Sequence, residues 1–298
     1  MDNRDEAKAF LTSRRAKISP EQAGLTVFHR NRRVPGLRRS EVADLAGVSV
    51  EYYTQLERGN LAGVSDSVLD AIARALRLDE AERQHLTDLA RTVGRAARPR
   101  RRPPAAQVRP SVTRVLELLT DVPAFVGNGR GDLLTANPLA EALYAPMFDD
   151  PVRPVNHARF VFLNPSSRGF WRDWDVVASD AVAMLRAEAG RDPFDRTLTD
   201  LVGELSTRSE DFRTLWAAHD VRLHRTGVKK FHHPVVGDLD LHIETVQLIA
   251  DPGLNMAMLT APAGSAGDDA LRLLASWAAT RQTDAAHHLT DDQGGGAP

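Results

Sequence analysis

Cysteine is absent from the 298 residues of this chain, which excludes disulfides, thiolate zinc sites, iron–sulfur clusters and cysteine nucleophiles. No run of eighteen apolar residues occurs, and the N-terminal stretch MDNRDEAKAF has no apolar segment after its charges. We therefore expect neither a membrane span nor a signal peptide, and we place the protein in the cytoplasm. With 42% hydrophobic residues, the chain can form two domains with a core in each.

The formal net charge is only −2, but the two signs are unevenly distributed along the chain. Residues 1–102 carry 20 Lys and Arg against 14 Asp and Glu, whereas the remainder carries 18 against 26. A basic half joined to an acidic remainder indicates a nucleic-acid-binding module followed by a different kind of domain. Charge alone fits equally well a soluble domain that happens to be basic.

The segment LRRSEVADLAGVSVEYYTQLERG has the pattern of two short helices. Apolar residues recur at helical spacing in both halves: Val42, Leu45 and Ala46, then Tyr53 and Leu56. Between them, Gly47 can take the positive φ that ends a helix, Val48 can fill the corner, and Ser49 can cap the second helix. Amphipathic patterns in residues 7–17 and 65–92 predict further helices. We expect a compact bundle of about five helices that contains a helix-turn-helix.

These residues resemble the Xre-type, phage-repressor-like helix-turn-helix family, from AGVS at the turn to LERG at the end of the second helix. The resemblance covers residues 8–92 and implies that residues 49–57 form the recognition helix, which enters the major groove of double-stranded DNA. It implies base contacts from Val50, Glu51 and Gln55, and backbone contacts from Ser49, Tyr52 and Arg39. It also implies that Glu57 is structural and pairs with Arg14 or Arg15.

The chemistry of the three base-facing candidates is compatible with this role. Gln55 can pair with an adenine edge and Val50 can contact a thymine methyl group. Glu51 can accept a hydrogen bond from cytosine N4, although nearby phosphates would repel it. For Tyr52, the alternative is a partly buried packing residue.

Five arginines lie within ten residues beside the predicted recognition helix: Arg30, Arg32, Arg33, Arg38 and Arg39. They are typical of a phosphate clamp that flanks a groove-reading helix. The alternative is a solvated surface loop.

The second half follows a linker rich in Arg and Pro, residues 96–107. Its pattern predicts a helix from Pro110, a hairpin within residues 123–136, a helix from Pro138 and a helical middle over residues 158–221. Three strands follow, with a hairpin turn at Gly237-Asp238. Because Leu241 and Val246 have opposite parity, we expect a bulge near Glu244 or Thr245. This order predicts an α+β domain with a sheet covered by helices.

Four stretches of this half resemble the MmyB-like ligand-binding domain, a PAS-like fold: DLLTANPLAEALY, NHARFVFLNPSSRGFWRDW, LVGELSTRSEDFRTLWAAHDV and GVKKFHHPVVGDLDLHIE. The resemblance implies a regulator with an internal pocket for a fatty-acid-like ligand. The pocket candidates that match these motifs are Asn156, Arg159, Trp174, Trp216, His219 and His233. Both tryptophans can instead belong to the core, and Asn156 or His219 can satisfy buried backbone groups.

Enzyme signatures are missing from the sequence. His219, His224, His232, His233 and His242 do not have metal-ligand spacing, and no HExxH, Gly-x-Ser-x-Gly or phosphate-binding loop occurs. We therefore expect no catalytic activity, no metal and no cofactor. The alternative to a ligand sensor is a protein-interaction platform without a ligand.

Our prediction is a homodimeric DNA-binding transcriptional regulator, mainly α with an α+β second domain. A five-helix bundle is followed by a PAS-like antiparallel sheet covered by helices. The expected boundaries are 1–95 for the DNA-binding domain, 96–107 for the linker, 108–265 for the ligand-binding domain, 266–280 for a last helix and 281–298 for a disordered tail.

Overall fold

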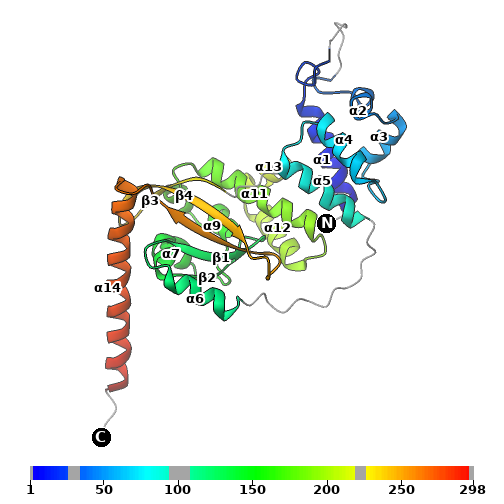
Figure 1. Cartoon of the computed structure of the whole chain (residues 1–298). Helices are drawn as coiled ribbons and strands as arrows, with labels where there is room; N and C mark the ends of the chain where they lie inside the picture. Colours follow the sequence, from blue (N-terminus) through cyan, green and yellow to red (C-terminus); the bar gives the residue numbers. More distant parts are fainter. Residues whose placement is uncertain (1–2, 26–33, 94–107, 219–225, 295–298) are drawn as a thin grey trace. The chain divides into compact units, whose positions relative to one another are not determined.

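The computed structural model describes residues 3–25, 34–93, 108–218 and 226–294 (Figure 1). Its contacts divide the chain into two compact units, one formed by residues 1–101 and 182–223 and the other by residues 102–181 and 224–298. Residues 182–223, which we expected in the C-terminal domain, thus cluster with the N-terminal helices. The domain boundaries drawn from the sequence stay a prediction.

The N-terminal part of the first unit is the predicted five-helix bundle. Its helices are α1 (Asn3–Lys17), α2 (Arg39–Ala46), α3 (Val50–Glu57), α4 (Asp66–Ala75) and α5 (Glu80–Val93). Their apolar faces meet in one core, whose largest fully buried members are Phe10, Leu11, Leu37, Tyr53, Leu56, Leu61 and Ile72.

The corner between α2 and α3 has the predicted helix-turn-helix geometry. Gly47 ends α2 at φ 67°, in the left-handed region that glycine tolerates best. The Ser49 hydroxyl accepts a hydrogen bond from the Tyr52 backbone N–H at 3.0 Å and so caps α3. Val48 packs against the core between them, as expected. Leu45, which we assigned to the apolar stripe of the first helix, is exposed.

The end of α11 (Trp174–Arg191), together with α12 (Arg196–Arg208) and α13 (Glu210–Ala217), completes the first unit. Arg186 is fully buried, forms an ion pair with Glu6 of α1, and donates to the backbone carbonyl of Trp216. His85 of α5 is also buried, with Nε2 3.8 Å from Glu6 Oε1. Buried charges persist only when they are paired, so this cluster ties α11 to α1 within the unit.

The second unit is built on a five-stranded antiparallel sheet in the order β2-β1-β5-β4-β3. The strands are β1 (Ala124–Asn128), β2 (Leu133–Ala136), β3 (Thr226–His233), β4 (Gly237–Gln247) and β5 (Leu254–Thr260). The helices are α6 (Pro110–Leu118), α7 (Pro138–Leu143), α8 (Ala145–Phe148), α9 (His157–Leu163), α10 (Ser167–Phe170), the start of α11, and α14 (Ala266–Gly294). The predicted fold class is therefore confirmed.

The two faces of this sheet are covered differently. On one face, α6 packs on the β1 and β5 side chains Ala124, Val126, Leu254 and Met256. The same face of β3 and β4 carries exposed residues, among them Val228 and Asp240. The opposite face carries Phe231, Leu239, Leu241 and Leu259, all buried. In the second unit, α7 contacts β1, α10 contacts β3, and α14 contacts β4. The helix α14 also contacts α7.

The prediction of a bulge near Glu244 or Thr245 is wrong. β4 pairs with β5 without a register shift from His242 to Gln247. The bulge was predicted in order to bring Val246 to the buried face of the strand. Val246 instead lies on the opposite face from Leu241 and is 46% exposed, so the strand continues without an extra residue. Among the described strands, the register shifts instead where β1 pairs with β2, between Val126 and Gly127.

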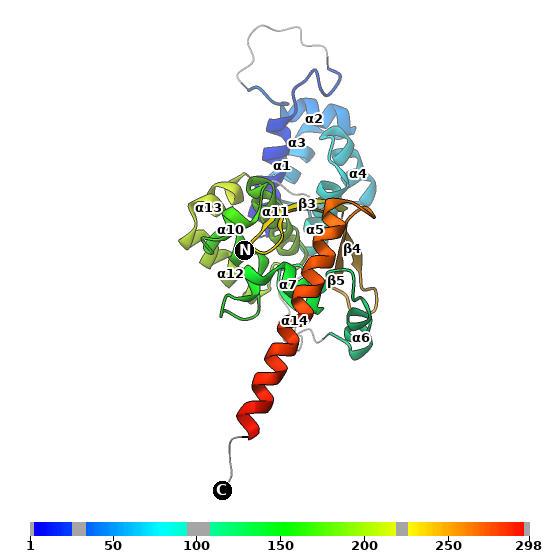
Figure 2. The same ribbon diagram turned by 90° about the vertical axis from the view of Figure 1, so that its left-hand side faces the viewer.

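The last helix continues beyond its predicted end. α14 begins at Ala266 and continues to Gly294, past residue 280, where we ended the helix. Its first part is anchored by the buried side chains Leu271, Leu274 and Ala278. Both views show its later part extending away from the sheet (Figures 1 and 2).

Two glycines in the loop after α3 provide a test of the bundle's packing. Both have positive φ, 86° at Gly59 and 74° at Gly63, but a Cβ at Gly59 would overlap the Arg4 backbone carbonyl, whereas a Cβ at Gly63 meets nothing within 4 Å. We expect Gly63→Ala to cost only the backbone strain, about 1–2 kcal/mol. Gly59→Ala should lower the free energy of unfolding by at least about 2 kcal/mol more, measured by urea denaturation. Equal losses would show that α1 does not approach Gly59 closely.

Candidate DNA-binding surface and ligand site

The candidate base-contacting residues share the exposed side of α3. Val50 is 38% exposed, and Glu51 and Gln55 are also exposed, whereas Tyr53, Leu56 and Glu57 on the opposite side are buried. The Gln55 side-chain oxygen accepts a hydrogen bond from the Asn60 amide at 2.7 Å. The three candidates thus lie together on the exposed side of α3.

Glu57 holds α3 against two other helices. Its carboxylate accepts hydrogen bonds from Arg15 of α1 at 2.7 and 3.0 Å, and from Arg39 of α2 at 2.9 Å. The Glu57 side chain is only 1% exposed. The expected structural pairing of Glu57 with Arg15 is therefore present, while Arg14 pairs with Glu82 instead. Arg39, a candidate backbone contact, is half-exposed and bonded to Glu57.

The two arginines also set the ionisation of Glu57. Burial of the carboxylate opposes its charge, but the hydrogen bonds and positive charges of Arg15 and Arg39 outweigh burial and lower the pKa of Glu57 below its ordinary 4.5. The hydrogen bond to Glu57 raises the pKa of Arg15. Both groups are thus charged at neutral pH, and they form an ion pair beneath the exposed side of α3.

The other candidate backbone contacts lie beside α3 or outside the described residues. Tyr52 is 40% exposed rather than packed in the core, and Ser49 is the α3 cap. Arg38 is exposed just before α2, where its backbone N–H donates to Glu41 at 2.6 Å. Arg30, Arg32 and Arg33 lie outside the residues that the structure describes.

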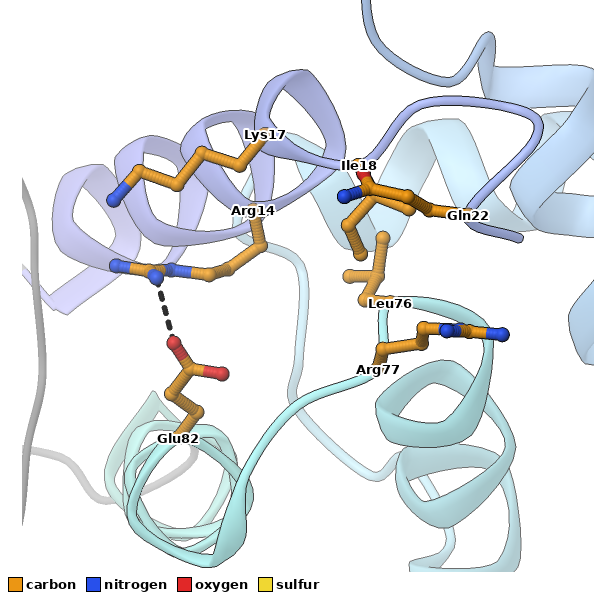
Figure 3. Close-up of a pocket in the computed structure, with 7 residues that line it drawn as sticks. All are labelled: Arg14, Lys17, Ile18, Gln22, Leu76, Arg77 and Glu82. Carbon is orange, nitrogen blue, oxygen red and sulfur yellow. Dashed lines mark hydrogen bonds and ion pairs between the residues drawn. The ribbon is translucent and has the colours of Figure 1, made fainter.

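A crevice of about 270 Å³ opens on the helical bundle between α1 and the α4–α5 connection (Figure 3). Its lining residues are Arg14, Lys17, Ile18, Gln22, Leu76, Arg77 and Glu82. Arg14 and Glu82 face each other across it at 2.6 Å. Burial outweighs the positive charge of Arg14 and raises the pKa of Glu82. The crevice combines three cations with one carboxyl group, and no sequence motif pointed to it.

Asn156, the first of the pocket candidates, closes a loop in the second unit. Its amide donates to Asp132 Oδ1 at 2.8 Å and to the Arg130 carbonyl at 3.0 Å, and its oxygen accepts from the Arg159 backbone N–H. It therefore caps α9, and Arg159 follows within the first turn with a half-buried side chain.

Trp174 and His233 also have hydrogen-bond partners within the second unit. The Trp174 indole N–H donates to the Val161 carbonyl at 3.2 Å, and the Arg168 guanidinium lies 3.8 Å from the ring centroid. His233 donates from Nε2 to the Ala142 carbonyl and accepts from the Val235 backbone N–H at Nδ1. Burial lowers the pKa of His233, which keeps the ring neutral.

The remaining two pocket candidates are not in the described part of the second unit. Trp216 belongs to the first unit, where it stacks on Phe212 with ring centroids 5.4 Å apart and lies under the Arg186 guanidinium. His219 lies outside the described residues. Four candidates, Asn156, Arg159, Trp174 and His233, are thus left in the second unit.

An aromatic cluster that sequence reasoning missed lies between the sheet and the helices of the second unit. Trp171 is its centre, with Phe231 at 4.9 Å, Phe170 at 5.0 Å, His157 at 5.7 Å and Tyr144 at 6.1 Å between ring centroids. All five belong to the motifs of the family resemblance, but the adjacency of Trp171 to Phe231 depends on an isolated bridge between distant segments.

Neither a metal site nor a membrane span is found in the described ranges. No three His, Asp or Glu side chains there are grouped in a way that could hold a metal ion. No helix within these ranges combines the length and apolar character needed to cross a bilayer.

Comparisons with protein families agree with both resemblances. The model of the "MmyB-like transcription regulator ligand binding domain" matches residues 108–274, more than half of the chain. The model of a "Helix-turn-helix domain" matches residues 13–86. A search of curated proteins found no match.

We predict that Glu57→Gln lowers the free energy of unfolding by about 3 kcal/mol at pH 7, because it leaves two cations beside a buried neutral group. Since the folded-state pKa of Glu57 lies below 4.5, its stabilisation is present above that value and is lost as pH falls through the folded pKa. Urea denaturation at several pH values should therefore show the gap between wild type and variant closing in acid.

The matched control is Glu80→Gln, since Glu80 is exposed and lies 3.9 Å from Arg83. We expect little change from this variant at any pH. A gap for Glu57→Gln that stays constant down to acid pH would contradict the ion-pair explanation.

Proposed function

We propose that this member of the MmyB-like transcription regulators, a DNA-binding regulator with a ligand-binding domain, reads double-stranded DNA with α3. We also propose that it responds to a small apolar, fatty-acid-like ligand. Transcription regulators of this family are not enzymes. We place the regulator in the cytoplasm, as a homodimer. The observation that carries the DNA-reading part is the exposure of Val50, Glu51 and Gln55 on one side of a capped and anchored helix.

In the proposed complex, α3 lies in the major groove. Gln55 exchanges its hydrogen bond with Asn60 for a bidentate pair with adenine, and Val50 contacts a thymine methyl group. Glu51 accepts from cytosine N4. These contacts provide base preference, while binding strength comes mainly from phosphates.

Phosphate contacts are assigned to residues around the base-reading side chains: Arg30, Arg32, Arg33, Arg38, Arg39, Ser49 and Tyr52. The exposure of Tyr52 and Arg38 supports their part in this set. Arg39 can reach a phosphate with part of its guanidinium, because half of its side chain is exposed while it bonds Glu57. The phosphate contacts orient the protein on the duplex and make its affinity depend on salt.

The apolar ligand is assigned to the second unit, with Asn156, Arg159, Trp174 and His233 as its candidate contacts there. Trp216 belongs to the first unit, and His219 lies outside the described residues. The ligand would act by binding two conformations unequally and so changing the placement of two DNA-binding heads in the dimer. The competing function is a protein-interaction platform. It is favoured by one observation, namely that Asn156, Trp174 and His233 are each hydrogen-bonded within the protein.

We expect Gln55→Ala to lose preference at one base pair of the operator, worth about 1–3 kcal/mol of discrimination. The operator is first selected from random duplexes with the full-length protein, and affinities are then measured for single-base variants. Arg38→Ala is the matched comparison, since it should weaken all sequences alike and reduce the salt dependence. Unchanged affinity and base preference for Gln55→Ala would contradict the assignment of α3 as the recognition helix.

We also expect the protein purified from its native host to carry an apolar small molecule. Native mass spectrometry compares this sample with a lipid-stripped one, and operator affinity is measured for both. A bound mass that stripping removes, with a changed operator affinity, is the expected result. No co-purifying molecule together with identical affinities would favour the interaction platform.

A further inference from the structure

Asn60 joins the candidate base-contacting residue Gln55 to the helix α1. The Asn60 NH2 group donates to Gln55 Oε1 at 2.7 Å, and Asn60 Oδ1 accepts from the Arg4 guanidinium. Gln55 is exposed and Asn60 is half-buried. Within the described residues, the Gln55 side chain makes no other hydrogen bond. Two hydrogen bonds in series therefore connect α1 to a side chain assigned to base reading.

The turn after α3 brings Asn60 back beside Gln55. Gly59 follows the C-cap residue Arg58 with φ 86°, and its backbone N–H donates to the Leu56 carbonyl at 2.9 Å. The Asn60 backbone N–H donates to the Gln55 carbonyl at 3.1 Å. These two bonds form the Schellman arrangement, which needs a left-handed residue at Gly59. The side chains of Gln55 and Asn60 thus lie side by side because their backbones are already hydrogen-bonded.

The N-terminal end of α1 packs against the same turn. The Arg4 carbonyl lies so close to Gly59 that a Cβ at this position would overlap it. Because Asn60 is the next residue along the chain, this contact brings the Arg4 side chain within reach of Asn60 Oδ1. The orientation of the Asn60 amide is therefore set by tertiary packing as well as by the local turn.

The chemistry of the three side chains fixes the direction of both amides. A guanidinium group can only donate, so the Asn60 atom that faces Arg4 must be its oxygen. The Asn60 atom that faces Gln55 is then the NH2 group, which can also only donate. Gln55 must therefore turn its oxygen toward Asn60. Its own NH2 group is left to meet a base.

A glutamine held in this way meets adenine and guanine unequally. Guanine presents two acceptors in the major groove, N7 and O6, which can take the N–H donors of Gln55 while its oxygen stays on Asn60. Adenine presents one acceptor and one donor, so the bidentate pair needs the Gln55 oxygen and breaks the bond to Asn60. Reading adenine therefore loses one hydrogen bond that reading guanine keeps.

We propose that Asn60, oriented by Arg4, is a specificity-determining residue that shifts the base preference of Gln55 from adenine toward guanine. Asn60 acts through Gln55 and is thus a positioning residue. The adenine pair forms only when Gln55 exchanges its bond to Asn60, so Asn60 sets how strongly adenine is preferred. This inference rests on the proposed function, because it requires Gln55 to meet a base.

The experiment uses the full-length protein and the operator selected for it. The base pair read by Gln55 is the one at which Gln55→Ala loses preference, and affinities are measured for duplexes with each of the four base pairs there. Asn60→Ala removes the side-chain bond but keeps the backbone bonds of the turn. We expect the ratio of adenine affinity to guanine affinity to rise about five-fold, as for the gain or loss of one neutral hydrogen bond.

Asn60→Asp tests the direction of the Gln55 amide. The new carboxylate still accepts from Arg4, but it has no donor for Gln55, which must turn its NH2 group inward and its oxygen outward. An outward oxygen accepts from a base donor, and cytosine presents the donor N4. We expect the preference to move from guanine toward cytosine. The added negative charge weakens binding to all four duplexes, which leaves their ratios unaffected.

Two arginine variants separate the orienting bond from a general effect of charge. Arg4→Met frees the Asn60 amide to turn, so it should raise the adenine-to-guanine ratio, but less than Asn60→Ala does. Arg4→Lys retains a donor and should keep the ratio near that of wild type. The matched control is Arg58→Met, since Arg58 is exposed on the same turn. It should weaken all four duplexes alike.

A double-mutant cycle decides whether Asn60 acts through Gln55. Asn60→Ala added to Gln55→Ala should leave base preference unchanged, because no amide is left to orient. A shift of the ratio in that background equal to the shift in wild type would overturn the proposal.

The outcomes distinguish this proposal from the proposed function. If Gln55→Ala loses preference at one base pair while Asn60→Ala keeps the wild-type ratio, the positioning role of Asn60 is wrong and α3 remains the recognition helix. If Gln55→Ala loses preference at no base pair, base reading by Gln55 and this inference fail together.

Discussion

The buried carboxylate of Glu57 is the interaction on which the DNA-binding unit depends. It projects from α3 and meets Arg15 of α1 and Arg39 of α2, so one group fixes three helices. A buried carboxylate is tolerated only when cations and hydrogen-bond donors surround it, which leaves α3 a single orientation. That orientation exposes Val50 and Gln55 together. The surface proposed to read DNA is therefore set by a residue on the opposite side of the same helix.

The helix α11 has a comparable place in the chain, because its two parts belong to different units. Within the second unit, Asp180 pairs with the partly buried Lys229 of the sheet. Within the first unit, Arg186 pairs with Glu6 of α1. The Arg186–Glu6 pair is buried, so removing one of its partners is costly.

Much of the helical bundle could be predicted because its signals are local. Gly47 and Ser49 define the α2–α3 corner through the conformations and hydrogen bonds that their own residue types favour. The register of the strands and the cover on each face of the sheet were harder to predict from the sequence. The bulge assigned to β4 came from requiring Val246 to be buried, whereas in the structure α6 covers β1 and β5 and leaves that end of β4 exposed. Parity within one strand cannot reveal which face a distant helix covers.

The sequence by itself determined the two-part organisation, the helix-turn-helix corner, the exposed residues of α3 and the family of each half, because these depend on neighbouring residues and short motifs. Only the tertiary structure decided that Arg15 and Arg39 both neutralise Glu57 and that residues 182–223 cluster with the DNA-binding helices. It also decided that Lys229 pairs with Asp180 and that Trp171 packs on Phe231. These contacts join segments far apart in the chain. Their energies come from burial and charge pairing, which exist only after the chain has folded.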